Sequence, residues 1–213
     1  MFYPTGTKKI NENVYAVRSL MVNFFVFTDG VDHICIDSGM SGIFAKMGLK
    51  KLGIDPDDIS HLFLTHTDYD HAGGVKVFKN ARTYISENEE QMINGTTSRL
   101  LKLKYNRLKT DYNLLKDNEE IQIGNIKVKA IDTPGHTPGS MSYIINDTYL
   151  FSGDTMTLRW NKLYPFYRLQ NMDTKKQRET INRLAEVDND ISWVFTAHTG
   201  YSDNYKEAIK RWS

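Results

Sequence analysis

His66-Thr67-Asp68-Tyr69-Asp70-His71 places four potential metal ligands within six consecutive residues. The stretch directly follows the apolar run His61–Thr65, which is typical of a β-strand. Because alternate side chains of an extended segment point to the same side, His66, Asp68 and Asp70 would project together. A single such residue is usually a helix cap or a surface group. Four of them at this density indicate a metal site.

Composition narrows the class of protein further. The chain has 213 residues, and its 27 Lys and Arg against 26 Asp and Glu leave a net charge of +1. This balance argues against binding nucleic acid or anionic lipid through bulk charge. A single cysteine excludes an internal disulfide framework and a cysteine-rich zinc ribbon. His and carboxylate side chains must therefore hold any metal.

We expect a soluble, cytoplasmic protein formed by a single domain over residues 1–213. The N-terminal residues lack the basic and apolar segments of a signal peptide, and the longest apolar runs are too short to span a bilayer. No linker rich in Pro, Gly or Ser divides the chain. The expected partner is a small-molecule substrate, and no membrane partner is expected.

The order of strand-like and helix-like segments predicts two packed β-sheets with helices on the outside. The expected strands are Asn13–Ser19, Met21–Thr28, Val31–Asp37, His61–Thr65, Thr83–Ser86, a hairpin within Ile121–Ile131, Met141–Asn146, Tyr149–Ser152 and Trp193–Ala197. The expected helices are Ile43–Leu52, a short one near Ala72–Lys79, Glu87 to about Lys109, Thr174–Val187 and Asp203–Trp212.

Three later segments each carry a candidate ligand just past a predicted strand. His136 lies in TPGHTPGS, Asp154 in FSGDT and His198 in FTAHTG. Loops at strand ends are where rigid scaffolds carry functional residues. Each segment alone is a weak signal, but their recurrence after the stretch at 66–71 indicates one shared site.

These motifs, in this order, resemble the metallo-β-lactamase superfamily of metallo-hydrolases. The family pattern is an Asp after an early strand, then His-x-His-x-Asp-His, then a His, an Asp and a His, each after a strand. The matching residues are Asp37 in ICIDSG, the stretch at 66–71, His136, Asp154 and His198. The resemblance covers about residues 13–200. It implies an α/β (α+β) fold, a four-layer αββα sandwich of two mixed β-sheets flanked by helices.

The resemblance also implies a role for each matching side chain. Asp70 would act as a catalytic residue that orients the attacking hydroxide and passes on its proton. Asp37 would support the ligand loops without touching a metal. The implied ligands are His66, Asp68 and His136 for one ion, Asp70, His71 and His198 for the other, and Asp154 between the two.

Asp68 is a departure from the family pattern, which has a second His there. A carboxylate still binds metal, but it is a harder and more negative donor than imidazole, which favours Fe or Mn over Zn²⁺. A carboxylate at this position is also similar to two branches of the superfamily, the diiron flavoprotein reductases and a nuclease-like branch linked to DNA uptake. We expect two divalent ions, with Zn²⁺ first and Fe or Mn as the alternatives.

The function predicted from this site is metal-dependent hydrolysis. A hydroxide held by two ions would attack an ester, thioester or lactone bond of a small substrate. One alternative is a diiron redox protein that reduces oxygen or nitric oxide, which would need an electron donor. Another is a phosphodiesterase or nuclease-like hydrolase, against which the near-zero net charge argues.

The remaining candidates have simpler interpretations. His33 and His61 are expected in strands away from the site, and Cys35 is expected to be buried. The basic and leucine-rich stretch Arg99–Lys109 predicts a solvated amphipathic helix, with a substrate-facing lid as the alternative. The aromatic and basic segment after Asp154 would cover the site. Its candidate substrate-binding residues are Arg159, Tyr164, Tyr167 and Arg168.

Overall fold

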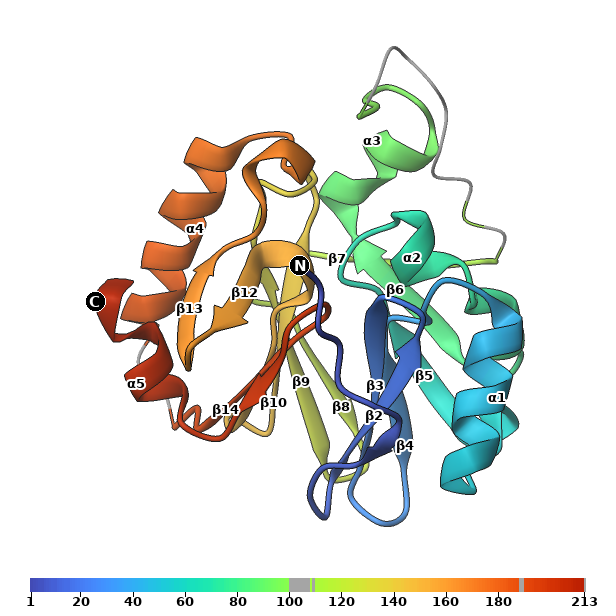
Figure 1. The fold of residues 1–213 in the computed structure, drawn as a ribbon. Helices are drawn as coiled ribbons and strands as arrows, with labels where there is room; N and C mark the ends of the chain where they lie inside the picture. The colour runs from blue at the N-terminus through green and yellow to red at the C-terminus, as the bar shows by residue number, and fades with distance from the viewer. Residues whose placement is uncertain (100–107, 109, 188–189, 213) are drawn as a thin grey trace.

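The protein folds into two large β-sheets packed face to face, with helices on both outer faces (Figure 1). The computed structural model describes residues 1–99, 108, 110–187 and 190–212. The expected four-layer sandwich of two mixed sheets flanked by helices is confirmed. Within the described ranges, no helix is long and apolar enough to cross a membrane.

The first sheet comprises, in the described part of the chain, seven strands that follow one another in chain order. Pairing is antiparallel from β1 to β4 and parallel from β4 to β7. The strands are β1 (Lys8–Lys9), β2 (Val14–Ser19), β3 (Val22–Thr28), β4 (His33–Ile36), β5 (Ile59–Phe63), β6 (Arg82–Ser86) and β7 (Asn113–Leu115).

The second sheet has the strand order β15-β14-β11-β10-β9-β8. Strand β11 pairs with β14 in parallel, and the other pairs are antiparallel. A separate hairpin joins β12 (Met156–Arg159) to β13 (Lys162–Pro165). The sheet strands are β8 (Glu120–Ile123), β9 (Ile126–Asp132), β10 (Met141–Ile145), β11 (Tyr149–Phe151), β14 (Trp193–Thr196) and β15 (Gly200–Ser202).

The helices lie on the outer faces, with α1 beside the first sheet and α4 and α5 beside the second (Figure 1). The α-helices are α1 (Gly42–Leu52), α2 (Tyr69–Ala72), α3 (Glu90–Ile93), α4 (Thr174–Glu186) and α5 (Tyr205–Ile209). Short 3-10 turns are η1 (Pro56–Asp58), η2 (Val75–Val77), η3 (Glu87–Glu89), η4 (Gly153–Thr155), η5 (Arg168–Gln170) and η6 (Lys210–Trp212).

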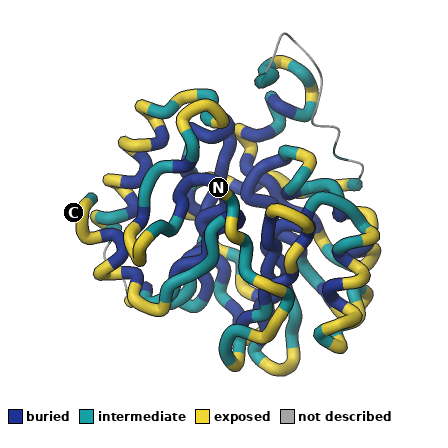
Figure 2. Tube along the Cα trace, in the orientation of Figure 1, coloured by how far each residue is buried: buried dark blue, intermediate teal, exposed yellow. Residues whose placement is uncertain are grey.

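Strand β3 illustrates how the layers pack. All of its residues are buried, because one face contacts the other sheet and the opposite face contacts the helical layer. Phe25 and Phe27 join the core between the sheets, whereas Phe24 and Val26 join the cluster beneath α1. This alternation follows the two-residue period of a strand. Figure 2 shows the strands as the buried interior, with exposed residues gathered on the outer helices and loops.

The short helix expected near Ala72–Lys79 begins earlier, inside the ligand-rich stretch. The Asp68 carbonyl accepts hydrogen bonds from the N–H groups of His71 and Ala72, both at 2.9 Å, so the helical turn α2 starts at Tyr69. A Cβ atom on Gly73 would collide with the Met40 carbonyl. Because Gly73 has no side chain, the chain can pass close to the Met40 backbone directly after α2, and it continues into η2.

Two other segments differ from their predictions. The helix expected from Glu87 to about Lys109 is, within the described residues, only η3 and α3, and positions 100–107 and 109 lie outside the described residues. The segment after Asp154 forms the β12–β13 hairpin. Its turn residues Trp160 and Asn161 have φ of 49° and 57°, which a two-residue type I′ turn requires. Trp-Asn is not a usual signal for that turn, which is why the hairpin was not expected.

The C-terminal helix predicted over Asp203–Trp212 is also shorter than expected. The side chain of Asn204 accepts a hydrogen bond from the Glu207 N–H at 3.1 Å, so α5 begins only at Tyr205. After Ile209 the chain continues as the 3-10 turn η6. Strands β1, β7 and β15 are short edge or end strands that the sequence pattern did not reveal.

Replacing Phe27 by Ala should lower the free energy of unfolding by about 3–5 kcal/mol. Phe27 is 1% exposed in the core between the sheets, so its removal leaves a cavity. Replacing Val31, which is 81% exposed, by Ala should change stability by less than about 0.5 kcal/mol. Chemical denaturation followed by circular dichroism measures both, and equal effects would contradict the placement of Phe27.

Candidate metal centre

The candidate ligands all follow the carboxyl ends of strands at one edge of the sandwich. Asp37 follows β4 and His66 follows β5, and these two strands are parallel neighbours. Asp154 follows β11 and His198 follows β14, which are the parallel neighbours of the second sheet. Because parallel strands end on the same side, each sheet brings its own ligands to this edge.

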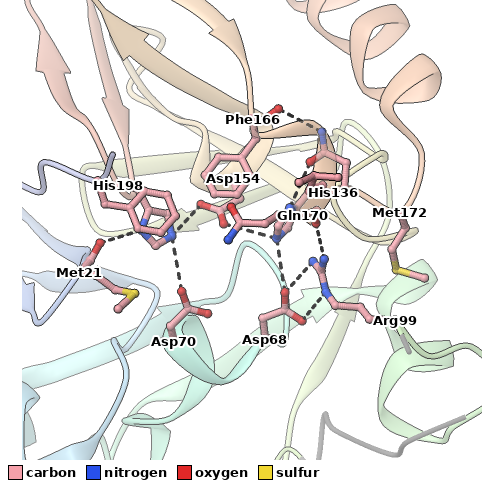
Figure 3. Close-up of a pocket in the computed structure, with 13 residues that line it drawn as sticks. Met21, Asp68, Asp70, Arg99, His136, Asp154, Phe166, Gln170, Met172 and His198 are labelled. Atoms are coloured by element: carbon pink, nitrogen blue, oxygen red, sulfur yellow. Dashed lines mark hydrogen bonds and ion pairs between the residues drawn. The ribbon is translucent and has the colours of Figure 1, made fainter. Parts of the chain in front are cut away.

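The side chains form two groups that meet at Asp154, and Figure 3 shows Asp154 between His136 of one group and His198 of the other. Its Oδ2 lies 3.3 Å from the Nε2 of His136. Its Oδ1 lies 3.3 Å from the Nε2 of His198 and 3.5 Å from that of His71. The first group is His66, His136 and Asp154, and the second is Asp70, His71 and His198. One carboxylate thus offers an oxygen to each group.

All four histidines of the site are held through their Nδ1 atoms. His71 Nδ1 lies 2.8 Å from Asp37 Oδ2, and His198 Nδ1 lies 2.7 Å from the Met21 carbonyl oxygen. His136 Nδ1 faces Asn171 Oδ1 at 3.3 Å, and His66 Nδ1 faces Thr65 Oγ1 at 3.0 Å. Acceptors at Nδ1 leave every Nε2 to face the site.

These donor atoms fit divalent ions. Within the described residues, Nε2 of His66, His71 and His198 and Oδ1 of Asp154 are buried without a hydrogen-bond partner. A buried polar atom without a partner is costly unless a ligand satisfies it. Donors about 2.1 Å from a tetrahedral ion lie about 3.4 Å from one another. The contacts of Asp154, at 3.3–3.5 Å, match that spacing.

Asp37 organises two of the ligands without facing the site. Its carboxylate accepts the Nδ1–H of His71 and also the Thr65 hydroxyl at 2.9 Å and the Thr65 N–H at 2.7 Å. Because the Thr65 proton is directed to Asp37, the Thr65 oxygen accepts the Nδ1–H of His66. Asp37 adopts a φ of 63°, a left-handed conformation that costs most residues about 1–2 kcal/mol.

The Asp68 carboxylate lies between the first group and Arg99. Its Oδ2 is 3.3 Å from His136 Nε2 and 3.5 Å from His66 Nε2. The Arg99 guanidinium binds both carboxylate oxygens, with Nη2 at 2.6 Å from Oδ2 and Nε at 3.1 Å from Oδ1. This pair could not be predicted from local sequence, because its members are 31 residues apart.

Glu89 is a second residue that the sequence did not single out. Its fully buried carboxylate accepts the N–H and the hydroxyl of Thr67, both at 2.8 Å, and the hydroxyl of Thr137 at 2.7 Å. Thr67 and Thr137 each lie next to a candidate ligand, His66 and His136 respectively. Glu89 therefore joins the ligand loops of the two sheets.

The charges in the site favour protons on the histidines of the second group when no metal is bound. Burial would lower the pKa of His71, but the charges of Asp37, Asp154 and Asp70 raise it well above its usual value. Burial would also lower the pKa of His198, but the negative charge of Asp154 raises it above its usual value. Burial lowers the pKa of His136 to about 4.

The carboxylates of Asp154 and Asp68 stay ionised. Burial would raise the pKa of Asp154, but His198, His71 and His136 hold it well below its usual range. Burial would likewise raise the pKa of Asp68, but hydrogen bonds with His136 and His66 and the charge of Arg99 lower it. Both carboxylates are thus anionic at every physiological pH.

A cavity of about 580 Å³ opens over the two groups. Its floor carries Asp68, Asp70, His136, Asp154 and His198. Asp70 is the most exposed of the carboxylates on that floor, at 27% of its side chain. The apolar part of the lining is Phe2, Met21, Phe166, Leu169 and Met172.

The four predicted substrate-binding residues do not line this cavity. The Arg159 guanidinium lies over the rings of Tyr164 and Tyr167, with 5.5 and 4.7 Å to the ring centroids. Tyr167 borders an adjacent depression of about 390 Å³, and Arg168 begins η5. The segment does reach the site, but through Phe166 and the residues that follow Arg168. Because the β12–β13 hairpin was not predicted from the sequence, the side chains of this segment that point toward the site could not be identified either.

The other residues considered from the sequence lie outside the two groups. His33 belongs to β4, and His61 lies in β5 with its ring stacked on those of Phe63 and Tyr84. Cys35 is fully buried, and its thiol donates to the Asp37 carbonyl at 3.1 Å. Arg99 is the described part of the basic stretch that reaches the cavity.

Comparison with known proteins identifies the family. The chain matches the metallo-beta-lactamase superfamily over residues 17–198. Two probable metallo-hydrolases of Methanocaldococcus jannaschii are each 32% identical to it. The match with one spans 92% of this chain and 93% of the relative, and the match with the other spans 80% and 70%. A beta-lactamase from Chitinophaga pinensis has a similar fold, with a TM-score of 0.72 at 22% identity over 92% of this chain and 78% of that one.

The fold, the His and Asp groups and these relatives define a metal-dependent hydrolase. The chain belongs to the metallo-β-lactamase superfamily. The resemblance seen in the order of the sequence motifs is confirmed.

Replacing Asp37 by Asn should weaken metal binding by about 10–100-fold, the usual loss when the hydrogen-bond support of a ligand is removed. The amide nitrogen cannot accept the protons of His71 and Thr65. Competition with a chromophoric chelator measures the affinity. His33→Ala is the control and should bind metal like the wild type. Unchanged affinity in Asp37→Asn would contradict the supporting role of this carboxylate.

Metal binding should release protons near neutral pH. His71 and His198, both of the second group, have raised pKa values in the folded, metal-free protein, so an ion bound by this group must displace the protons that these rings hold. Lowering the pH through those pKa values favours the protonated site, and the affinity should therefore fall from about pH 8 to about pH 6. Calorimetric titration in buffers of different ionisation enthalpy counts the protons released. An affinity independent of pH would contradict this account.

Proposed function

We propose that the protein binds two divalent ions and hydrolyses an ester, thioester or lactone bond of a small substrate. The supporting observation is the position of Asp154, which offers one oxygen to each group of histidines. When bound, a pair of divalent ions lowers the pKa of a water molecule and polarises the bond under attack. Zn²⁺ is the ion we propose first, with Fe or Mn as alternatives because the Asp68 carboxylate lies beside His66 and His136 of the first group.

The exposure of the side chains suggests different roles for the buried candidate ligands and for Asp70. His66, His71, His136, His198 and Asp154 are buried and can hold the ions without contact with bulk water. Asp70 faces the cavity with 27% of its side chain exposed and lies 3.4 Å from His198 Nε2. From there it can orient the attacking water, accept its proton and return that proton to the leaving group.

The cavity favours a substrate with apolar groups and little charge. Phe2, Met21, Phe166, Leu169 and Met172 supply its apolar surface. Among the described lining residues, Arg99 is the one arginine or lysine, and its guanidinium already contacts Asp68. A phosphodiester would need positive side chains that can bind its oxygens. This distribution supports an acyl substrate over a phosphodiester, and a small molecule over a nucleic acid.

Replacing Asp154 by Ala should reduce the metal content and abolish hydrolysis, because both groups lose a shared donor. Metal analysis of the purified protein and a panel of ester, thioester, lactone and bis-nitrophenyl phosphate substrates test this. His61→Ala, outside the two groups, is the control and should keep metal and activity. Full metal occupancy in Asp154→Ala would sink the assignment.

The same measurements separate the competing chemistries. Colourless protein that contains two Zn²⁺ or Mn²⁺ ions and cleaves an acyl substrate would support the proposal. Two irons with a visible absorption band, and no hydrolysis, would instead favour the diiron redox alternative. Selective cleavage of the phosphodiester would favour the nuclease-like alternative.

A further inference from the structure

The starting point is the unusual ligand position at residue 68. The oxygen Asp68 Oδ2 lies 3.3 Å from His136 Nε2 and 3.5 Å from His66 Nε2. These separations equal those between Asp154 and its own histidines. Asp68 Oδ2 therefore lies where a fourth donor would stand beside the three of the first group, and Figure 3 shows it next to His136.

A carboxylate at this position needs a different support from an imidazole. Each histidine of the site is held by an acceptor at Nδ1. A carboxylate has no N–H to donate, so only a donor can fix its orientation. A second carboxylate beside Asp154 also adds negative charge to a buried group, which an adjacent cation can offset.

Arg99 supplies both the donors and the charge. Its Nε donates a hydrogen bond to Asp68 Oδ1 at 3.1 Å, and its Nη2 forms an ion pair with Asp68 Oδ2 at 2.6 Å, so the planar guanidinium contacts both oxygens of the carboxylate. Its Nη1 donates to the Gln170 carbonyl oxygen, which anchors the guanidinium from the opposite wall of the cavity. Both side chains are mostly buried, with 21% exposed for Arg99 and 18% for Asp68, so solvent screens the pair only in part.

We propose that Arg99 is a positioning residue for the first metal group, and that Asp68 and Arg99 together replace the histidine of the family pattern. Arg99 directs Asp68 Oδ2 toward His66 and His136 and offsets the charge of the added carboxylate. A histidine at position 68 would need no guanidinium. This inference rests on the proposed two-ion site, since it assigns Asp68 to one of the two ions.

A double-mutant cycle with metal affinity as the readout tests the pair. The proteins are the wild type, Asp68→His, Arg99→Met and the double variant, and affinities come from competition between Zn²⁺ and a chromophoric chelator without any substrate. Arg99→Met should lower the affinity for one of the two ions by about 10–100-fold, the usual loss when a residue that orients a metal ligand is removed. The same change in the Asp68→His background should have less than about a threefold effect, because the carboxylate to be oriented is gone.

Two further variants exclude a general loss of structure. Arg183 is the matched control, because it also binds a carboxylate, Asp117 at 3.1 Å, and a backbone carbonyl, that of Asp132, outside the cavity. Arg183→Met should keep both ions. Arg99→Lys should retain only part of the affinity, because an ammonium keeps the charge and loses the bidentate geometry.

Three outcomes would overturn the inference. These are an unchanged affinity in Arg99→Met, an equal loss in both backgrounds, and an equal loss in Arg183→Met. If His136→Ala binds Zn²⁺ as tightly as the wild type does, the inference and the two-ion proposal are both overturned. A protein that binds two ions, shows the expected cycle and cleaves no acyl substrate would contradict the proposed function and leave the role of Arg99 intact.

Discussion

The buried carboxylate of Asp37 is the constraint on which the rest of the site depends. An anion removed from water must be surrounded by donors, and here the donors are Thr65 and His71. Each donor thereby receives a fixed orientation, and Thr65 passes that orientation on to His66. The left-handed backbone at Asp37 turns its side chain from the end of β4 toward β5. The geometry of two candidate metal ligands is thus set by one residue that does not line the cavity.

The sequence was most informative where candidate ligands lie close together in the chain or directly after a predicted strand. His66, Asp68, Asp70 and His71 occur in one short stretch, and His136, Asp154 and His198 each follow an apolar strand beside glycine or proline. Since the carboxyl ends of parallel strands gather at one edge, strand order alone brings such residues near one another. The fold class and the groups of candidate ligands could therefore be predicted together.

Contacts between distant segments could not be predicted in this way. Glu89 lies 22 residues from Thr67 and 48 from Thr137, and nothing near it in the sequence indicates a buried carboxylate. The pairing of Arg99 with Asp68 depends equally on tertiary structure. The substrate-binding residues predicted after Asp154 do not line the cavity, because the turn at Trp160-Asn161 determines which side chains face inward. Local patterns predicted the ligands, whereas tertiary packing decides what supports them.

The division of the ligands between two sheets makes the site a link across the whole sandwich. His66 and His71 come from the segment that follows β5 of the first sheet, and Asp154 and His198 follow β11 and β14 of the second. An ion held by both sets, as proposed above, would therefore add a link between the two sheets. A ligand that binds only the folded state stabilises it by about 2.7 kcal/mol at a hundred times its dissociation constant. If the proposed ions bind only the folded state, the thermal stability of the protein would rise with the free metal concentration around it. The lifetime of the folded protein would then follow the metal supply.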